Sequence, residues 1–361
     1  MRLLLRGIDR WLFEEYRTGA DDLALYRIFF AGYVLLNALP MGLWRLPQAA
    51  YSPTYSLAAF FTDFPGYGLM VALNAAALLC ACCVLIGYRT ALASVGLALS
   101  LVAVDSFAFA DGKVDEGLVI WIALVLAGSG WGSALSVDAR KPRDPSALRR
   151  QPWLLAILSL LVGLALLTAG AAKAKGGWLG LGTLGTRYHL FWNYFVYERP
   201  TLAAGWAWEH MPVSLWKAGD VATVLWEMGF CLACFRRSWC RVACAIGALF
   251  HLGVWMLFDI RVADNVVAYA AFCGWAAAAA ACPEGLRARL RALSPAQLRV
   301  VRVLPFGYAS AVLLLPQLKG LVAPLVSKAV LATGALVAVL YLAARAKQLL
   351  SKPALERANG E

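Results

Sequence analysis

Ionisable side chains lie inside long apolar stretches of this sequence, where each of them needs a partner. Glu227 and His251 are well within such stretches, and Asp105 is in the last third of another. A charge at the depth of a lipid bilayer costs several kcal/mol unless it is paired or hydrated, so each of these residues marks a candidate functional site. Carboxylate and imidazole groups there could bind a polar group or move a proton.

Two lysines add a possible base. Lys173 and Lys175 follow a further apolar stretch, and Trp178 comes five residues after Lys173. A lysine accepts a proton only when its amine is uncharged, a state that apolar surroundings favour. A lysine at the end of a membrane helix can equally extend its ammonium group to water. The residues alone leave both interpretations open.

The composition requires lipid around most of the chain. Hydrophobic residues make up 61% of it and charged residues only 15%, whereas soluble domains keep roughly a quarter of their residues charged. Ten apolar stretches are near the roughly 20 residues that a spanning helix needs. We therefore predict an all-α polytopic membrane bundle with about ten transmembrane helices. They cover residues 23–39, 67–87, 91–110, 117–135, 153–172, 221–235, 242–258, 262–281, 300–315 and 321–344.

Basic residues alternate along the chain in step with these stretches. The cytoplasmic loops of membrane proteins are enriched in lysine and arginine. Most of the 33 lysine and arginine residues fall before the first stretch, after the last, or in every second connection between them. Both termini are therefore predicted to be cytoplasmic, in a plasma membrane. The net charge of +12 then reflects orientation and anionic lipid headgroups, and no nucleic-acid partner is expected.

Three regions follow from this topology. Residues 1–22 predict an amphipathic helix at the inner membrane surface, and residues 23–282 predict the main transmembrane domain. Within it, residues 173–219 form a predicted outer lid that is rich in tryptophan and tyrosine, as is typical of the headgroup level. Residues 283–361 predict a basic cytoplasmic loop, two further helices and a basic tail.

The positions of the ionisable residues suggest a cavity. By topology they fall in the middle or outer half of the membrane, except for Arg27, which we expect to reach the inner surface. This asymmetry predicts a polar cavity that opens to the outer face. Helix ends are commonly polar, and that alternative explains Asp259 and Asp264 as well as a cavity does. The predicted lining residues are Asp105, Trp178, Asp220, Glu227 and His251, with Lys173 as the catalytic candidate.

Several other patterns are not expected to carry chemistry. The run Gly180-Leu-Gly-Thr-Leu-Gly185 has the spacing of a dinucleotide-binding loop, but it follows an apolar helix rather than a strand. The nine cysteines lie in apolar helices or near the reducing cytoplasm, where disulfides are rare. The three histidines are isolated, so no metal site is predicted.

Short motifs resemble a known family. The run Gly170-Ala-Ala-Lys173-Ala-Lys175-Gly-Gly-Trp178 resembles the glycine, lysine and tryptophan motif of the horizontally transferred transmembrane domain family, which includes the membrane region of vitamin K-dependent gamma-carboxylase. The resemblance covers about residues 20–280. Further similar motifs are Leu23-Ala-Leu-Tyr-Arg27, Gly87-Tyr-Arg89-Thr, Ser136-Val-Asp138-Ala, and Phe250-His251 followed by residues 262–272.

The resemblance implies an activity at the outer membrane face. Lys173 matches the lysine that deprotonates a reduced quinone in the carboxylase, so a reduced quinone is the cofactor implied. The chain departs from the carboxylase in two ways, because residues 105–116 contain no histidine and no large outer domain follows the membrane region. Bacterial relatives include maturation factors for secreted peptides. We therefore expect a carboxylase-like enzyme or a peptide-maturation factor, with membrane lipids and a secreted peptide or partner protein as its partners.

Two other classes of function remain. A non-enzymatic binding or immunity protein would hold a lipid or peptide in the same cavity without changing a bond. A transporter is less favoured, because transporters are commonly built from repeats and the two halves of this sequence show none.

Overall fold

The structure is a computed structural model that describes residues 2–38, 66–108, 117–140, 151–199, 201–281, 283–284, 288 and 295–358. Within these residues all regular structure is helical, which confirms the predicted all-α class. The chain divides into two compact units. Unit 1 comprises Met1–Leu158 and Cys273–Val326, and unit 2 comprises Ser159–Phe272 and Ser327–Glu361. The predicted regions 1–22, 23–282 and 283–361 stay a prediction.

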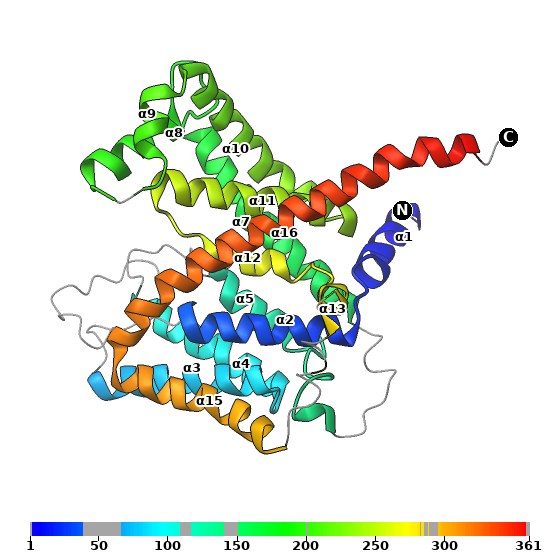
Figure 1. Ribbon diagram of the computed structural model, residues 1–361, viewed down its shortest axis with the longest axis vertical. Coiled ribbons are helices and arrows are strands. Elements are labelled where there is room, and N and C mark those ends of the chain that lie inside the picture. Colours follow the sequence, from blue (N-terminus) through cyan, green and yellow to red (C-terminus); the bar gives the residue numbers. More distant parts are fainter. Residues whose placement is uncertain are drawn as a thin grey trace. The chain divides into compact units, whose positions relative to one another are not determined.

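Unit 1 packs its helices around α3 and α4 (Figure 1). Helix α3 contacts α2, α4 and α15, and α4 in turn contacts α5. Amphipathic residues 2–15 are helical, as the sequence predicts. The elements are α1 (Arg2–Arg10), η1 (Trp11–Glu15), α2 (Ala20–Tyr33), η2 (Val34–Ala38), α3 (Tyr67–Ile86), α4 (Thr90–Ala108), α5 (Gly117–Leu126), η6 (Asp138–Arg140), α13 (Trp275–Ala280) and α15 (Pro295–Leu314).

Unit 2 contains the predicted lid and the helices on either side of it. Helix α10 contacts α8 and α11, and α11 contacts α8, α9 and α12. Two helices, α7 and α16, begin in unit 1 and continue into unit 2. The elements are α7 (Pro152–Lys175), α8 (Gly185–Phe191), η7 (Trp192–Val196), α9 (Ala204–His210), α10 (Val213–Ala233), α11 (Arg237–Phe258), α12 (Ala263–Ala270) and α16 (Pro316–Ala358).

Five helices among the described residues are long and apolar enough to span a membrane. They are Tyr67–Ile86, Thr90–Phe107, Pro152–Lys175, Arg237–Phe258 and Gln317–Ser351. This confirms the general prediction of an integral membrane protein, while the count of ten spans stays a prediction.

Two predicted spans are shorter than expected. The stretch 117–135 is helical only over Gly117–Leu126, because a glycine-rich turn follows in which Gly130 has a φ of 74°. The stretch 262–281 is divided into α12 and α13, and the interruption ends at Gly274, the residue before α13. Glycine lowers helix stability and favours such interruptions.

A buried arginine joins three segments of unit 1. Arg27 is 0% exposed, so our expectation that it extends to water is wrong. Its guanidinium donates to Val84 O at 3.1 Å and to Leu135 O at 2.7 Å. Both acceptors are backbone carbonyls, one in the last turn of α3 and one in the non-helical segment that precedes η6. Arg27 therefore stabilises the packing of α2 on α3 and on the segment before η6.

Asp138 completes this junction. It accepts hydrogen bonds from the backbone N–H of Arg89 at 2.9 Å and of Thr90 at 2.8 Å, and from the Thr90 hydroxyl at 2.7 Å. It thus caps the N-terminus of α4, where backbone donors are free and negative charge is favoured. Between α3 and α4, Gly87 adopts a φ of 70°.

We expect Gly87→Ala to destabilise the protein by about 2–4 kcal/mol, through left-handed backbone strain and overpacking. A Cβ at Gly87 would lie 2.0 Å from Arg27 Nη1 and 2.2 Å from Ser136 Cβ. Thermal unfolding in detergent measures the effect. The matched control is Gly68→Ala in α3, where a Cβ would meet nothing within 4 Å. Equal melting temperatures for the two variants would contradict this account of the junction.

Candidate functional site

Helices α7 and α10 approach closely at two glycines of unit 2. A Cβ at Gly163 would lie 2.8 Å from Cys234 Sγ, and a Cβ at Gly170 would lie 2.9 Å from Glu227 Cβ. The Cys234 thiol donates to Ser159 O at 3.0 Å along the same contact. Small residues at such spacing let membrane helices pack backbone against backbone. Gly170 therefore places Glu227 directly against α7.

Lys173 and Glu227 form an ion pair at this contact. Lys173 Nζ lies 2.8 Å from both carboxylate oxygens of Glu227. Helical side chains lean toward the N-terminus of their helix, so Lys173 reaches back from the last turn of α7 toward the level of Gly170. The Glu227 side chain is 6% exposed and that of Lys173 is 27% exposed. Each charge thus has its counter-charge inside the protein.

His251 of α11 lies in a second set of contacts, with α12. Its Nε2 is 3.0 Å from Tyr269 Oη and 3.1 Å from Asn265 Nδ2. The Trp226 ring stands edge-on to the imidazole, with centroids 5.9 Å apart. Gly247 makes room for these rings, since a Cβ there would lie 2.6 Å from Trp226 Cζ2 and 2.8 Å from Tyr269 Cε2.

The two sets of contacts belong together. They share α10, because Trp226, whose ring contacts the His251 imidazole, is the residue before Glu227. Helices α7, α10, α11 and α12 thus bring five polar side chains into one region of unit 2. We call Lys173, Glu227, His251, Asn265 and Tyr269 the polar cluster.

A glycine-rich turn leads from Lys173 into α8. The Trp178 ring lies 5.7 Å from Lys173 Nζ, within the range of a cation–π interaction, and 5.5 Å from the His189 ring. A Cβ at Gly185 would lie 2.5 Å from Trp178 Cε2, so the turn packs directly on the indole. The turn runs between two helices, α7 and α8, which is not the strand–turn–helix context of a dinucleotide-binding loop.

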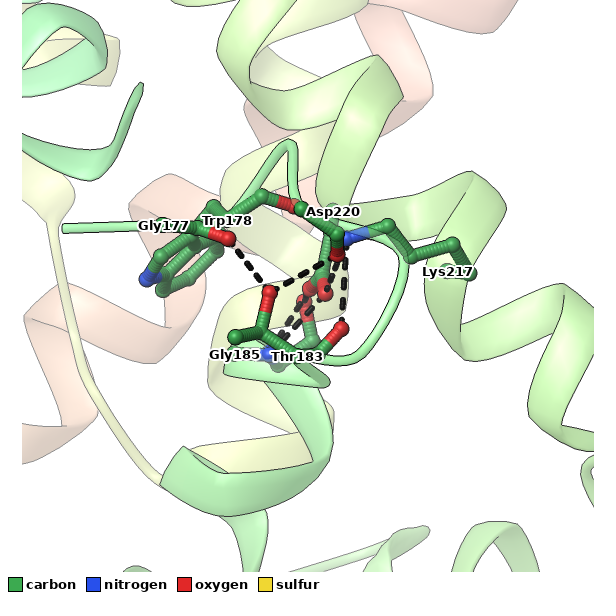
Figure 2. A network of polar contacts seen from close by, with 8 residues as sticks. Gly177, Trp178, Thr183, Gly185, Lys217 and Asp220 are labelled. Atoms are coloured by element: carbon green, nitrogen blue, oxygen red, sulfur yellow. Dashed lines mark hydrogen bonds and ion pairs between the residues drawn. The ribbon is translucent and has the colours of Figure 1, made fainter. Parts of the chain in front are cut away.

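Asp220 and Lys217 of α10 fix this turn (Figure 2). Asp220, 0% exposed, accepts from the backbone N–H of Gly185 at 2.9 Å and of Thr186 at 2.8 Å. It also accepts from the Thr186 hydroxyl. Lys217 Nζ lies 3.8 Å from the Asp220 carboxylate.

The same lysine binds the backbone on the other side of the turn. Lys217 donates to Trp178 O, and to Thr183 O at 3.2 Å. Leu184, the N-cap residue of α8, has no side-chain acceptor for the first backbone N–H groups of the helix, and Asp220 provides those acceptors instead. The pair therefore holds both ends of the turn against α10, and with them the Trp178 ring beside Lys173.

His189 lies on the face of Trp178 within the lid. Burial lowers the pKa of His189 below its ordinary value, and the positive charge of Lys173 lowers it further, while Asp220 acts in the opposite direction. The imidazole is therefore neutral at pH 7, which avoids a second positive charge next to Lys173.

The structure brings together most of the residues that the sequence singled out. Lys173, Glu227 and His251 belong to the polar cluster, and Trp178 contacts Lys173 directly. Asp220 is not a member of the cluster and instead binds the backbone of the turn that carries Trp178. Asp105 lies in α4 of unit 1, and both its role and the predicted outer cavity stay predictions.

The sequence analysis did not single out two members of the cluster, Asn265 and Tyr269. Tyr269 lies four residues after Asn265, on the same face of α12, and both contact His251. The i, i+4 spacing of Asn265 and Tyr269 could have indicated that the two side chains share a helix face. A tyrosine in an apolar helix does not stand out, because tyrosine is common there without any polar role.

Among the described residues no group of three or more histidine, cysteine, aspartate or glutamate side chains could hold a metal ion. No protein-family description, no curated protein and no solved structure matches this chain.

We expect Glu227→Leu to lower the free energy of unfolding by about 2 kcal/mol, because it leaves the Lys173 ammonium without its counter-charge. The loss is smaller than the roughly 3–5 kcal/mol of a fully buried pair, because Lys173 is partly exposed. Adding Lys173→Met should recover most of the stability, since apolar pairs replace buried ion pairs at little cost. Melting curves of both variants in detergent give the comparison.

The exposed Glu209 of α9 offers a control, because Glu209→Leu removes the same charge without removing an ion pair. If the double variant is no more stable than Glu227→Leu alone, the ion pair does not account for the loss.

Proposed function

We propose that this chain is an integral plasma-membrane protein with about ten spans, related to the horizontally transferred transmembrane domain family, with both termini in the cytoplasm. Five long apolar helices support the membrane location. Helices α2, α5, α10, α12 and α15 lie at the other predicted apolar stretches, which the proposal counts as the remaining crossings. The alternation of basic residues supports the orientation.

The number of spans decides on which sides the two ends lie. Ten crossings place Met1 and Glu361 on the same side, whereas five crossings place them on opposite sides. A fluorescent protein fused after Glu361 should therefore fold and emit in a bacterial host, and alkaline phosphatase there should stay inactive. A phosphatase fused after Arg199, in the predicted outer lid, should be active. An active phosphatase after Glu361 would exclude the ten-span arrangement.

For the activity, we propose a carboxylase-like or peptide-maturation enzyme that acts on a lipid-soluble or peptide substrate near the outer face. One observation carries this proposal, the Lys173–Glu227 ion pair next to His251. Three titratable groups on three helices of a membrane unit have a cost in stability. Chemistry or recognition at the site accounts for that cost better than packing does.

Glu227 gives Lys173 a route to act as a base. The ammonium first transfers a proton to a Glu227 oxygen 2.8 Å away, which breaks an N–H bond and forms an O–H bond. The pair then carries no charge, a state that apolar surroundings favour over separated charges. The amine lone pair can accept a proton from a substrate, and Trp178 covers one side of it.

The reduced quinone implied by the resemblance is compatible with these groups. The cluster contains a buried polar atom without a hydrogen-bond partner among the described residues, His251 Nδ1, which suits an oxygen-bearing ring. Such a quinone would supply an acidic hydroxyl, and Lys173, Trp178 and His251 would hold it.

A second candidate is a non-enzymatic lipid- or peptide-binding protein. The ion pair is compatible with this candidate as well, because Glu227 already neutralises Lys173, which then needs no chemical role. The cluster would then recognise a ligand without changing a bond.

Lys173→Arg separates the two functions. Arginine keeps the positive charge and the pairing with Glu227, but it is not deprotonated in proteins. We expect the purified variant to retain the same lipid-soluble molecule or peptide as the wild type, but in its unprocessed form, and Lys173→Ala to retain less of it. Mass spectrometry of the co-purified molecules makes the comparison.

Identical molecules in the wild type and in Lys173→Arg would support binding without catalysis. Bulk phospholipid alone in all three proteins would contradict both candidates.

A further inference from the structure

The two ring nitrogens of His251 have different surroundings. Nε2 lies within hydrogen-bond distance of Tyr269 Oη and Asn265 Nδ2. Nδ1 has no hydrogen-bond partner among the described residues, although the residue is only 4% exposed. Leaving a buried polar atom unpaired costs about 1–3 kcal/mol. The arrangement therefore needs a reason that the contacts inside the protein do not provide.

Asn265 determines which nitrogen carries the proton. An amide nitrogen only donates hydrogen bonds, so the Nε2 atom 3.1 Å from Asn265 Nδ2 must accept and cannot bear a hydrogen. The Tyr269 hydroxyl, which can donate to the same atom, is compatible with this assignment. A neutral imidazole has one proton, and here it is on Nδ1. His251 thus presents a buried N–H donor.

The surroundings of this donor are apolar and hold a second donor. The rings of Trp226, Phe250 and Tyr269 contact the imidazole, with centroids 5.3–5.9 Å away. Trp226 precedes Glu227 along α10, and its buried Nε1 also has no hydrogen-bond partner among the described residues. Indole nitrogen only donates. Both unpaired atoms are donors, so each would be satisfied by an acceptor such as an oxygen atom, and not by a cation.

We propose that the polar cluster binds an apolar molecule through an acceptor oxygen that receives the Nδ1–H of His251. Asn265 is the positioning residue that fixes this tautomer. The ligand class is an otherwise apolar compound with a carbonyl or comparable oxygen. The proposal rests on the proposed function only for the location of the ligand, and it holds whether or not Lys173 performs catalysis.

The tautomer is measured directly by nuclear magnetic resonance. The chain has three histidines, so protein with isotope-labelled histidine in maltoside micelles gives the nitrogen signals of three imidazole rings, and His251→Gln identifies those of His251. We expect a protonated Nδ1 and an unprotonated Nε2. In Asn265→Asp a carboxylate accepts where the amide donated, so the proton should move to Nε2. Tyr269→Phe, the matched control, should leave it on Nδ1.

A pair of probes tests the ligand class. A long-chain methyl ketone and the alkane of equal length differ only in the acceptor oxygen, and maltoside detergent contains no carbonyl group to compete. We expect the ketone to shift the Nδ1–H signal of His251 to lower field as its concentration rises. The alkane should leave the signal unchanged. In Asn265→Asp, where Nδ1 carries no hydrogen, the ketone should leave the His251 nitrogen signals unchanged.

A protonated Nε2 in the wild type would overturn the role of Asn265. A ketone that shifts nothing, or an alkane that shifts the signal equally, would overturn the ligand class. Neither result depends on the Lys173→Arg comparison, so a failure here is distinguishable from a failure of the proposed activity.

Discussion

A charge inside an apolar helical protein must have its partner within the protein, and much of this structure follows from that constraint. Water and lipid headgroups are not available to a side chain that is buried between helices. Arg27 meets the requirement in unit 1 with two backbone carbonyls, Val84 O and Leu135 O. Lys173 meets it in unit 2 with the carboxylate of Glu227. The first solution joins backbone segments, and the second leaves two titratable groups in contact.

Glycines make both solutions geometrically possible. At Gly87 the left-handed backbone and the missing side chain leave room for the Arg27 guanidinium. At Gly170 the missing side chain brings α7 against Glu227, within reach of Lys173. A buried charge therefore constrains which residues the nearby backbone can carry, as well as which group is its partner. This explains why glycines occur close to ionisable residues in two unrelated places along the chain.

The sequence predicts the helices and several site residues well, for a physical reason. Apolar runs of helical length are a strong signal, and a charge such as Glu227 or His251 inside them is conspicuous because it is costly. The contacts between these residues depend on how the helices pack against one another, and a single apolar stretch gives no information on that packing. The role of Asp220 could not be predicted, because its partners are backbone N–H groups 34 and 35 residues away. The prediction that Arg27 reaches the inner membrane surface was wrong for the same reason, because its acceptors are backbone carbonyls and not side chains.

Hydrogen-bond satisfaction distinguishes Asp220 from His251. Asp220 has both oxygens occupied by the turn it holds, so the fold alone accounts for it. Arg27 donates to two carbonyls through its terminal nitrogens, whereas its buried Nε has no hydrogen-bond partner among the described residues. At His251, Asn265 contacts one ring nitrogen, and the other is buried without a hydrogen-bond partner among the described residues. A group that served only stability would gain from a partner at both positions. The unpaired nitrogen of His251 supports the proposed contact with a molecule outside the chain.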